Sequence, residues 1–326
     1  MTLRSQEVRA QILALLRSAT EAAANAASRE IANGQCENAG AAASDAMTEV
    51  LGHFPYCATV VSGQGAKGDV DSLYEGQVFG DPDSDIEFDL AIDPGEGTTY
   101  VVEGLTNAMS IAALAPRGTM CEPKPALYME KFAAPAAAVG EIEPHWEVDR
   151  KLAALGKVLG KDIEDLTVFV LEKPRHRDLI EQIRETGARV ASYPAGDVAA
   201  ALLATFPASK IDALMGTGGV REGIVSACAA RGLGAQFNWR IDPQLQSELA
   251  GIRNAKLPLD RWYGAHDLVT SDETYVCATG IATGLLLEGV ARAPGEDRYQ
   301  TLTIAVGERK LMTTWRPAGE PGGANS

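Results

Sequence analysis

The sequence lacks a long apolar segment. No stretch approaches the roughly 20 consecutive apolar residues that a helix needs to cross a bilayer. The N-terminal segment MTLRSQEVRAQILALLRS carries a charge every few residues and has no apolar core. These observations exclude a membrane-spanning helix and argue against a signal peptide. We therefore expect no membrane partner and a cytoplasmic location.

Basic residues are scarce. The chain has 44 acidic residues against 29 Lys and Arg, which gives a formal net charge of −15. Such a surface repels nucleic acid, so we expect no nucleic-acid partner. A small phosphorylated ligand is still compatible with this charge, because a metal ion or a local Arg/Lys cluster can reverse the sign inside a cleft.

Cysteine and histidine are few as well. The five cysteines are odd in number and no pair has C-x-x-C spacing, so we expect reduced thiols rather than a disulfide framework. Of the four histidines, His53, His145 and His266 lack the spacing of metal ligands.

The sequence does have enough apolar residues for a large core, since they make up 46% of its 326 residues. An acidic, proline-rich stretch at 133–148 is the best boundary between two lobes. We expect an N-terminal lobe over 1–146, a C-terminal α/β lobe over 147–318 and a disordered tail over 319–326.

Hydrophobic periodicity predicts the elements. In the first lobe it indicates helices over 4–33 and from about 37 to 51, strands at 58–61 and 88–92, and one or two strands within 100–115. In the second lobe, strands at 167–171, 189–193 and 211–215 alternate with helices near 147–158, 177–186, from about 197 and from about 221. A hairpin of 299–306 with 309–315 closes the chain. Alternating strands and helices predict an α/β fold.

The strongest chemical signal is Asp93-Pro94-Gly95-Glu96-Gly97-Thr98, which we expect just after the strand at 88–92. Proline should stop the ladder and the glycines allow a sharp turn. Two carboxylates three positions apart, with the Thr98 hydroxyl nearby, suit Mg²⁺ or Mn²⁺. The alternative is an acidic turn that caps a helix.

Two further segments are compatible with phosphate binding. Gly216-Thr217-Gly218-Gly219 lies between a predicted strand and helix, where glycines and helix N-terminal amides favour an anion. It lacks the ending of a P-loop, and a tight turn explains it equally well. Lys173-Pro174-Arg175-His176 follows a strand, and Arg175 could hold a phosphate bidentately. A solvated basic turn is the alternative.

Taken together, the motifs carry a resemblance to a known family. The segments DLAIDPGEGTT, PALYMEKF, EKPRHRDLI, YPAGDVAAALLA, GTGGVREGIVSA and SDETYVCATGI occur in the order seen in the class II fructose-1,6-bisphosphatase/sedoheptulose-1,7-bisphosphatase family. The resemblance covers residues 35–315. It implies the two-lobed, layered αβαβα fold of the lithium-sensitive phosphatases and metal-dependent removal of phosphate from a ketose bisphosphate by activated water. It also implies a dimer or tetramer.

The resemblance assigns roles by position. Metal-binding carboxylates fall at Asp93, Glu96 and Glu222, and the phosphate-side turn falls at Gly97 and Thr98. Thr98 would help to position the water; the family's usual water activator is not matched here, and Asp69 or Asp71 is our candidate base. The expected substrate contacts, with Lys173 added from the basic turn, are Tyr128, Lys173, Arg175, His176, Gly196, Asp197 and Gly219.

Several positions depart from the family pattern. Ala39 and Gln64 stand where the family has a metal-binding aspartate and glutamate. Gln35 replaces a substrate-side lysine, and Ala195 replaces a substrate-binding aspartate. The acidic cluster of the family has become a segment containing Lys67. Three remaining carboxylates suit one divalent ion rather than two.

These departures leave three functions open. The leading hypothesis is a metal-dependent sugar phosphatase with one retained metal and altered activity or substrate. A non-catalytic sugar-phosphate-binding or regulatory protein explains the lost ligands directly. An enzyme that carries out a different reaction on a sugar phosphate, such as isomerisation or cyclisation, is the third.

Overall fold

The computed structural model describes residues 3–32, 34–35, 38–101 and 107–318. The chain splits into two compact units, Met1–Met120 with Glu273–Ser326, and Cys121–Asp272. The sequence-based boundary near 147 differs from this division, because strands after residue 273 return to the first sheet. The predicted tail at 319–326 and the predicted helix start at 37 lie outside the described residues.

The first unit contains a sheet that, within the described residues, has eight strands. Their order is β12-β13-β11-β4-β3-β1-β2, with β14 on the other edge of β13. The bounds are β1 (Cys57–Ser62), β2 (Val78–Gly80), β3 (Glu87–Glu96), β4 (Met109–Pro116), β11 (Tyr275–Gly280), β12 (Ala291–Ala293), β13 (Glu296–Ala305) and β14 (Glu308–Pro317). β1 and β3 are parallel, and the other pairs of this sheet are antiparallel.

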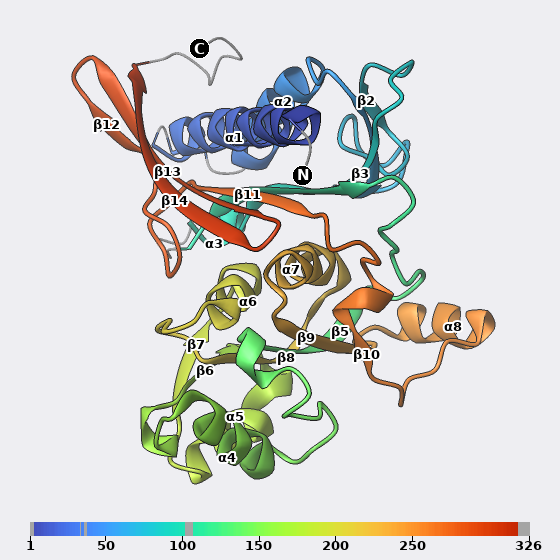
Figure 1. The fold of residues 1–326 in the computed structure, drawn as a ribbon, viewed down its shortest axis with the longest axis vertical. Helices are drawn as coiled ribbons and strands as arrows, with labels where there is room; N and C mark the ends of the chain where they lie inside the picture. Colours follow the sequence, from blue (N-terminus) through green and yellow to red (C-terminus); the bar gives the residue numbers. More distant parts are fainter. Residues whose placement is uncertain (1–2, 33, 36–37, 102–106, 319–326) are drawn as a thin grey trace. The chain divides into compact units, whose positions relative to one another are not determined.

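Two helices, α1 (Leu3–Ala32) and α2 (Ala39–Leu51), lie side by side against one face of this sheet (Figure 1). Alanine, the residue with the highest helix propensity, fills much of α1. Ile12, Leu16 and Ala23 of α1 are fully buried in one core cluster with Leu90 of β3. The small side chains of α1 let it lie close to the sheet.

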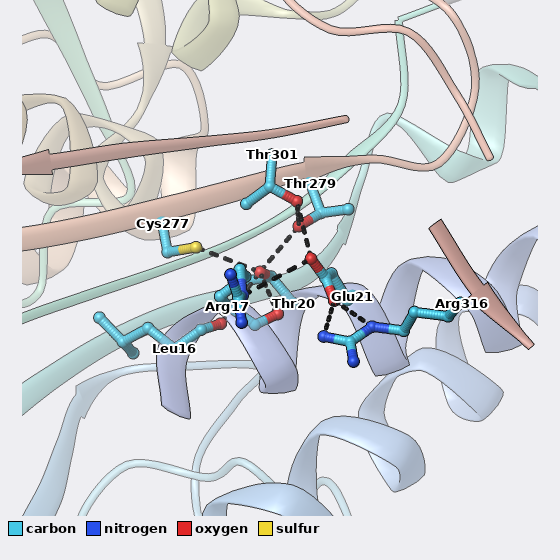
Figure 2. A network of polar contacts seen from close by, with 8 residues as sticks. All are labelled: Leu16, Arg17, Thr20, Glu21, Cys277, Thr279, Thr301 and Arg316. Atoms are coloured by element: carbon cyan, nitrogen blue, oxygen red, sulfur yellow. Dashed lines mark hydrogen bonds and ion pairs between the residues drawn. The ribbon is translucent and has the colours of Figure 1, made fainter. Parts of the chain in front are cut away.

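A buried polar network joins α1 to the far edge of the same unit (Figure 2). The Thr279 hydroxyl donates to Thr20 at 2.9 Å. The buried Glu21 carboxylate accepts a hydrogen bond from Arg316 Nε at 2.7 Å. The first helix and the last strand are therefore tied through the core.

The second unit is built on a six-stranded sheet, counted within the described residues, of order β10-β9-β5-β8-β6-β7. Its strands are β5 (Tyr128–Ala134), β6 (Thr167–Leu171), β7 (Arg189–Tyr193), β8 (Ala213–Gly219), β9 (Gln236–Ile241) and β10 (Tyr263–Gly264). Strands β6, β7 and β8 are parallel, whereas β5 runs antiparallel to β8 and β9.

Helices cover both faces of this second sheet (Figure 1). On one face lie α4 (Val148–Leu159) and α5 (Arg177–Glu185), and on the other lie α6 (Asp197–Thr205) and α7 (Val220–Leu233). Another helix, α8 (Gln246–Ala255), follows β9. Across the described ranges, no helix has the length and apolarity that crossing a membrane requires.

The predicted α/β class is confirmed, and the predicted strands at 167–171 and 189–193 match β6 and β7. Two predictions of strand ends were wrong. β3 continues through Pro94 to Glu96, and β8 continues through its glycines to Gly219. In both cases pairing with a neighbouring strand outweighs the local turn signal of Pro and Gly. The sequence also gave no expectation for β5, β9 or β11.

Candidate functional site

The acidic motif lies on a β-bulge at the end of β3. Asp93 pairs with Ile111 of β4 and Glu96 pairs with Met109, so a step of three along β3 matches a step of two along β4. The extra residue is the mark of a bulge. Because positions two apart on a strand share a face, Asp93 and Glu96 both project from one face of the sheet. Leu90 and Ile92 occupy the opposite face, in the core beneath α1.

The turn after the bulge is closed by its own polar groups. Asp93 Oδ1 accepts the N–H of Gly95 at 3.0 Å, and the Thr98 hydroxyl donates to the Gly95 carbonyl at 2.8 Å. Gly97 has φ +78°, and a Cβ there would lie 2.7 Å from the Asn107 carbonyl oxygen. Only glycine fits this position. The Thr98 oxygen, at the start of α3 (Thr98–Val101), keeps lone pairs that can accept a hydrogen bond.

The donor set of this turn fits a hard divalent cation. Mg²⁺ is commonly held by one or two carboxylates, with waters and substrate phosphate oxygens completing its shell. Asp93 and Glu96 supply two such carboxylates from a rigid element, and Glu96 is almost fully buried. In the part of the chain that the structure describes, no three His, Cys, Asp or Glu side chains gather as a metal-ligand group. Glu222 as a third ligand stays a prediction.

Three other positions of interest in the first unit, Ala39, Gln64 and Asp69, come earlier in the sequence than this turn. Asp69 is exposed in the loop between β1 and β2, and its N–H donates to the Ala66 carbonyl at 3.1 Å. Gln64 is partly buried two residues after β1. Ala39 is fully buried and belongs to the core cluster under α1 and α2. The role of Asp69 as a base stays a prediction.

In the second unit, the carboxyl ends of three parallel strands meet at one edge of the sheet. β6 leads to the turn Pro174–His176, β7 leads to Gly196 and β8 ends at Gly219. Tyr128, the first residue of antiparallel β5, pairs with Gly219 and so lies at the same edge. The structure therefore gathers the predicted substrate residues where ligands bind in open α/β sheets.

Arg175 is anchored at this edge by two contacts. Its Nη2 donates to the Thr217 carbonyl at 2.8 Å, and its guanidinium lies 5.6 Å from the centre of the Tyr128 ring. The side chain is otherwise exposed, so further N–H donors of the guanidinium face solvent. A fixed guanidinium of this kind suits a phosphate. Neighbouring Lys173 is partly buried at the start of the same turn.

His176 is buried and both of its ring nitrogens are engaged. Nδ1 lies 2.7 Å from the Leu171 carbonyl, and Nε2 accepts the N–H of Thr217 at 2.8 Å. This pattern assigns the neutral tautomer with the proton on Nδ1. Burial lowers the pKa of His176, and the hydrogen bond to the Leu171 carbonyl offsets part of this effect. The ring thereby holds the turn after β6 against β8.

Three charged groups meet beside the glycines of β8. Lys131, nearly fully buried on β5, lies 2.7 Å from Asp197 at the start of α6. A Cβ on Gly218 would lie 2.2 Å from Asp197 Oδ2, and one on Gly219 would lie 1.9 Å from Glu222 Oε2. Burial raises the pKa of Glu222, the charge of Asp197 adds to this effect, and Lys131 opposes it.

Sequence reasoning missed Lys131. The available signal was alternation along β5, where Met129 and Lys131 share one face and Glu130 lies on the other. A lysine on the same face as a buried methionine needs a buried anion, and Asp197 supplies it.

The helix N-termini at this edge add partial positive charge. Gly196, with φ +100°, is the N-cap of α6, and Gly219 is the N-cap of α7. The segment Gly216–Gly219 was expected in a loop, but it forms the end of β8 and so delivers its last residue directly to the helix. Amides at a helix N-terminus favour an anion, and the contact at Gly219 stays a prediction.

The fold and these groups define a class: an α/β protein with two carboxylates on a strand bulge in one unit and an anchored arginine at the carboxyl edge of the sheet in the other. The chain belongs to the family described as bacterial fructose-1,6-bisphosphatase, glpX-encoded, whose model matches residues 10–315.

Curated relatives agree with this membership. A protein of Synechococcus sp. (strain JA-2-3B'a(2-13)) named D-fructose 1,6-bisphosphatase class 2/sedoheptulose 1,7-bisphosphatase is 36% identical over 315 residues, covering 89% of this chain and 90% of that protein. A protein of Acaryochloris marina (strain MBIC 11017), named D-fructose 1,6-bisphosphatase class 2/sedoheptulose 1,7-bisphosphatase 2, is 35% identical over 309 residues, covering 87% and 88%.

Proposed function

We propose that this chain is a metal-dependent phosphatase that removes phosphate from a phosphorylated sugar. Fructose 1,6-bisphosphate and sedoheptulose 1,7-bisphosphate are the first substrates to test, because the relatives are named for them. The observation that carries the proposal is the bulge in β3, which turns Asp93 and Glu96 toward the same side of the sheet. This placement favours a working metal site over an acidic turn that only caps a helix.

The proposed roles follow from the groups at hand. Asp93 and Glu96 would hold Mg²⁺ or Mn²⁺, with Glu222 as the third ligand. A bound divalent cation would supply Lewis-acid polarisation of the phosphoryl group. The Thr98 oxygen would accept a hydrogen bond from the attacking water and so orient it, and Asp69 or Asp71 is the candidate base that would take the water's proton.

The substrate would be held from the edge of the second sheet. Arg175 and Lys173 carry the positive charge for the substrate's other phosphate, and the amide of Gly219 adds a donor. Tyr128, Gly196 and Asp197 would contact the sugar. His176 would act through its hydrogen bond to Thr217, which fixes the backbone of β8 beside Arg175.

The altered positions predict weaker or redirected activity. Ala39 and Gln64 contribute no charge, so the remaining carboxylates suit one cation. Each 1.36 kcal/mol of lost transition-state stabilisation slows the reaction tenfold. We also expect a dimer or tetramer, which light scattering on the purified chain would measure.

A non-catalytic sugar-phosphate binder is the second candidate. It is favoured by Ala39, whose side chain is fully buried in the core and now serves packing. A protein of this kind would bind the sugar phosphate through the edge of the second sheet and release no phosphate. A different reaction on the same ligand would change the sugar while leaving the phosphate attached.

The deciding experiment is a phosphate-release assay on sugar mono- and bisphosphates with Mn²⁺ or Mg²⁺. Asp93→Asn and Glu96→Gln should abolish release, whereas Asp85→Asn, at an exposed carboxylate before β3, should leave it unchanged. Sugar products would be identified in parallel. Metal-dependent binding of a sugar phosphate without any release would sink the phosphatase and favour the binder, and an altered sugar would favour the third function.

A further inference from the structure

A pocket in the second unit lies on the face of the sheet opposite to the Lys131–Asp197 pair. Phe132 and Glu130 of β5 line it, and they alternate along the strand with Lys131. Pro144 and Trp146 lie before α4, and Trp262 lies before β10. The volume is about 410 Å³, within the range of small-molecule sites. None of the proposed catalytic or substrate residues is among its lining side chains.

Lys151 of α4 is the unusual group in this pocket. The residue is only 8% exposed. Its Nζ lies 5.7 Å from the centre of the Phe132 ring and 5.5 Å from that of Trp262, two rings that line the pocket. Among the described residues, its ammonium has no hydrogen-bond or ion-pair partner. Burial lowers the pKa of Lys151, and the nearby Glu130 carboxylate offsets part of this effect.

The neighbouring charges set how many negative charges a ligand can carry. Arg240 also lines the pocket, but its guanidinium is matched by Glu130 at 2.5 Å. Glu147 and Asp260 line the pocket as exposed carboxylates, which repel a multiply charged anion. Lys151 is the lining lysine for which no ion pair is found among the described residues, and a ligand with one negative charge would meet less repulsion from Glu147 and Asp260 than a dianion would.

The walls define the rest of the ligand. Trp262 already has the Arg240 guanidinium 5.1 Å from its ring centre, and Trp146, Phe132 and Met215 add apolar surface. Aromatic walls favour a flat apolar group through offset stacking. A ligand of this shape would leave its anionic end for Lys151.

We propose that this pocket is a second ligand site of the protein, one that takes an aromatic monocarboxylate, with Lys151 as the carboxylate-binding residue. The site is independent of the phosphatase proposal, because its residues take no part in that reaction. The ligand would sit against β5, the strand that also carries Lys131 on its other face.

Isothermal titration calorimetry of the full chain tests this site, with benzoate as the probe. Phthalate, a dianion, and benzyl alcohol, which is neutral, serve as matched ligands. We expect saturable benzoate binding that is at least tenfold tighter than binding of either matched ligand. No saturable benzoate binding, or equal binding of benzyl alcohol or phthalate, would overturn the proposal.

Variants place the binding in this pocket. Lys151→Met should weaken benzoate binding at least tenfold, and Lys157→Met, at an exposed lysine of the same helix, should leave it unchanged. Trp262→Leu should also weaken binding at least tenfold, and it decides the matter if Lys151→Met does not fold. Benzoate affinity within twofold of wild type in a folded Lys151→Met, or in Trp262→Leu where the former does not fold, would overturn the site.

Discussion

In the second unit, the carboxylates of the candidate site lie so close to two glycines of β8 that a larger residue there would displace them. Gly219 has φ −70°, so alanine suits its backbone, but the added Cβ would lie 1.9 Å from Glu222 Oε2. Since that atom is the end of a flexible side chain, Gly219→Ala should lower the free energy of unfolding by less than about 1 kcal/mol. If Glu222 is a metal ligand, Mn²⁺ affinity should fall about 10- to 100-fold by calorimetry.

The matched control for this change is Gly264→Ala. Its Cβ would lie 3.9 Å from Asp267 Oδ2, an ordinary contact. This variant should keep both stability and Mn²⁺ affinity. Unchanged Mn²⁺ affinity in folded Gly219→Ala would count against Glu222 as a ligand.

His176 links stability to pH. Its folded pKa lies below the ordinary value of about 6.5 because the ring is buried. The stability contributed by the neutral ring is therefore present above about pH 6.5 and is lost as the pH falls toward the folded pKa. His176→Gln should cost about 1–3 kcal/mol at pH 8, since a buried partner loses its hydrogen bond. The melting temperature of this variant should then fall less steeply from pH 7.5 to 5.5.

His53→Gln, at an exposed histidine, is the control for that pH series. It should reproduce the wild-type slope. Parallel melting curves for wild type and His176→Gln across the same range would show that the buried ring does not contribute to the acid response.

At the scale of elements, one buried ion pair joins β5 to α6. Lys131→Met would leave Asp197 buried without its cation, which should cost about 3–5 kcal/mol in urea unfolding. Adding Asp197→Asn should recover part of that loss, because the uncompensated charge is gone. Lys161→Met should cost less, because the Lys161 side chain, which pairs with Asp212, is 33% exposed. Additive effects of the two changes at Lys131 and Asp197 would mean that the pair is not coupled.

The sequence predicted those elements whose signals are local. β6 and β7 are short apolar runs between turn residues, and their bounds match the prediction. The ends of β3 and β8 could not be predicted, because pairing with β4 and β5 carries each strand through residues that locally signal a turn. For the same reason, the motif identified Asp93 and Glu96, but the bulge that aligns them depends on distant Met109 and Ile111.

Long-range pairing also explains what was missed about the chain as a whole. β11 pairs with β4 across more than 150 positions, so residues after 273 join the first unit, and no local pattern announces this. Lys131 was missed because its partner Asp197 lies 66 positions away in the sequence. The burial of Lys131 can be recognised only once the positions of β5 and α6, which carry the two charges, are known.

The return of the chain to the first unit gives the last prediction. Two nitrogens of the Arg316 guanidinium, on β14, donate to the Glu21 carboxylate of α1 (Figure 2). The Glu21 side chain has no exposed surface. Arg316→Met should cost about 3–5 kcal/mol, because the Glu21 carboxylate would remain buried and lose its close cation, with Arg17 3.8 Å away as the remaining ion-pair partner among the described residues. Lys310→Met, in an exposed pair on the same strand, should cost at most about 1 kcal/mol. Urea unfolding measures both, and equal costs would mean that β14 is held by backbone pairing with β13 rather than by its tie to the first helix.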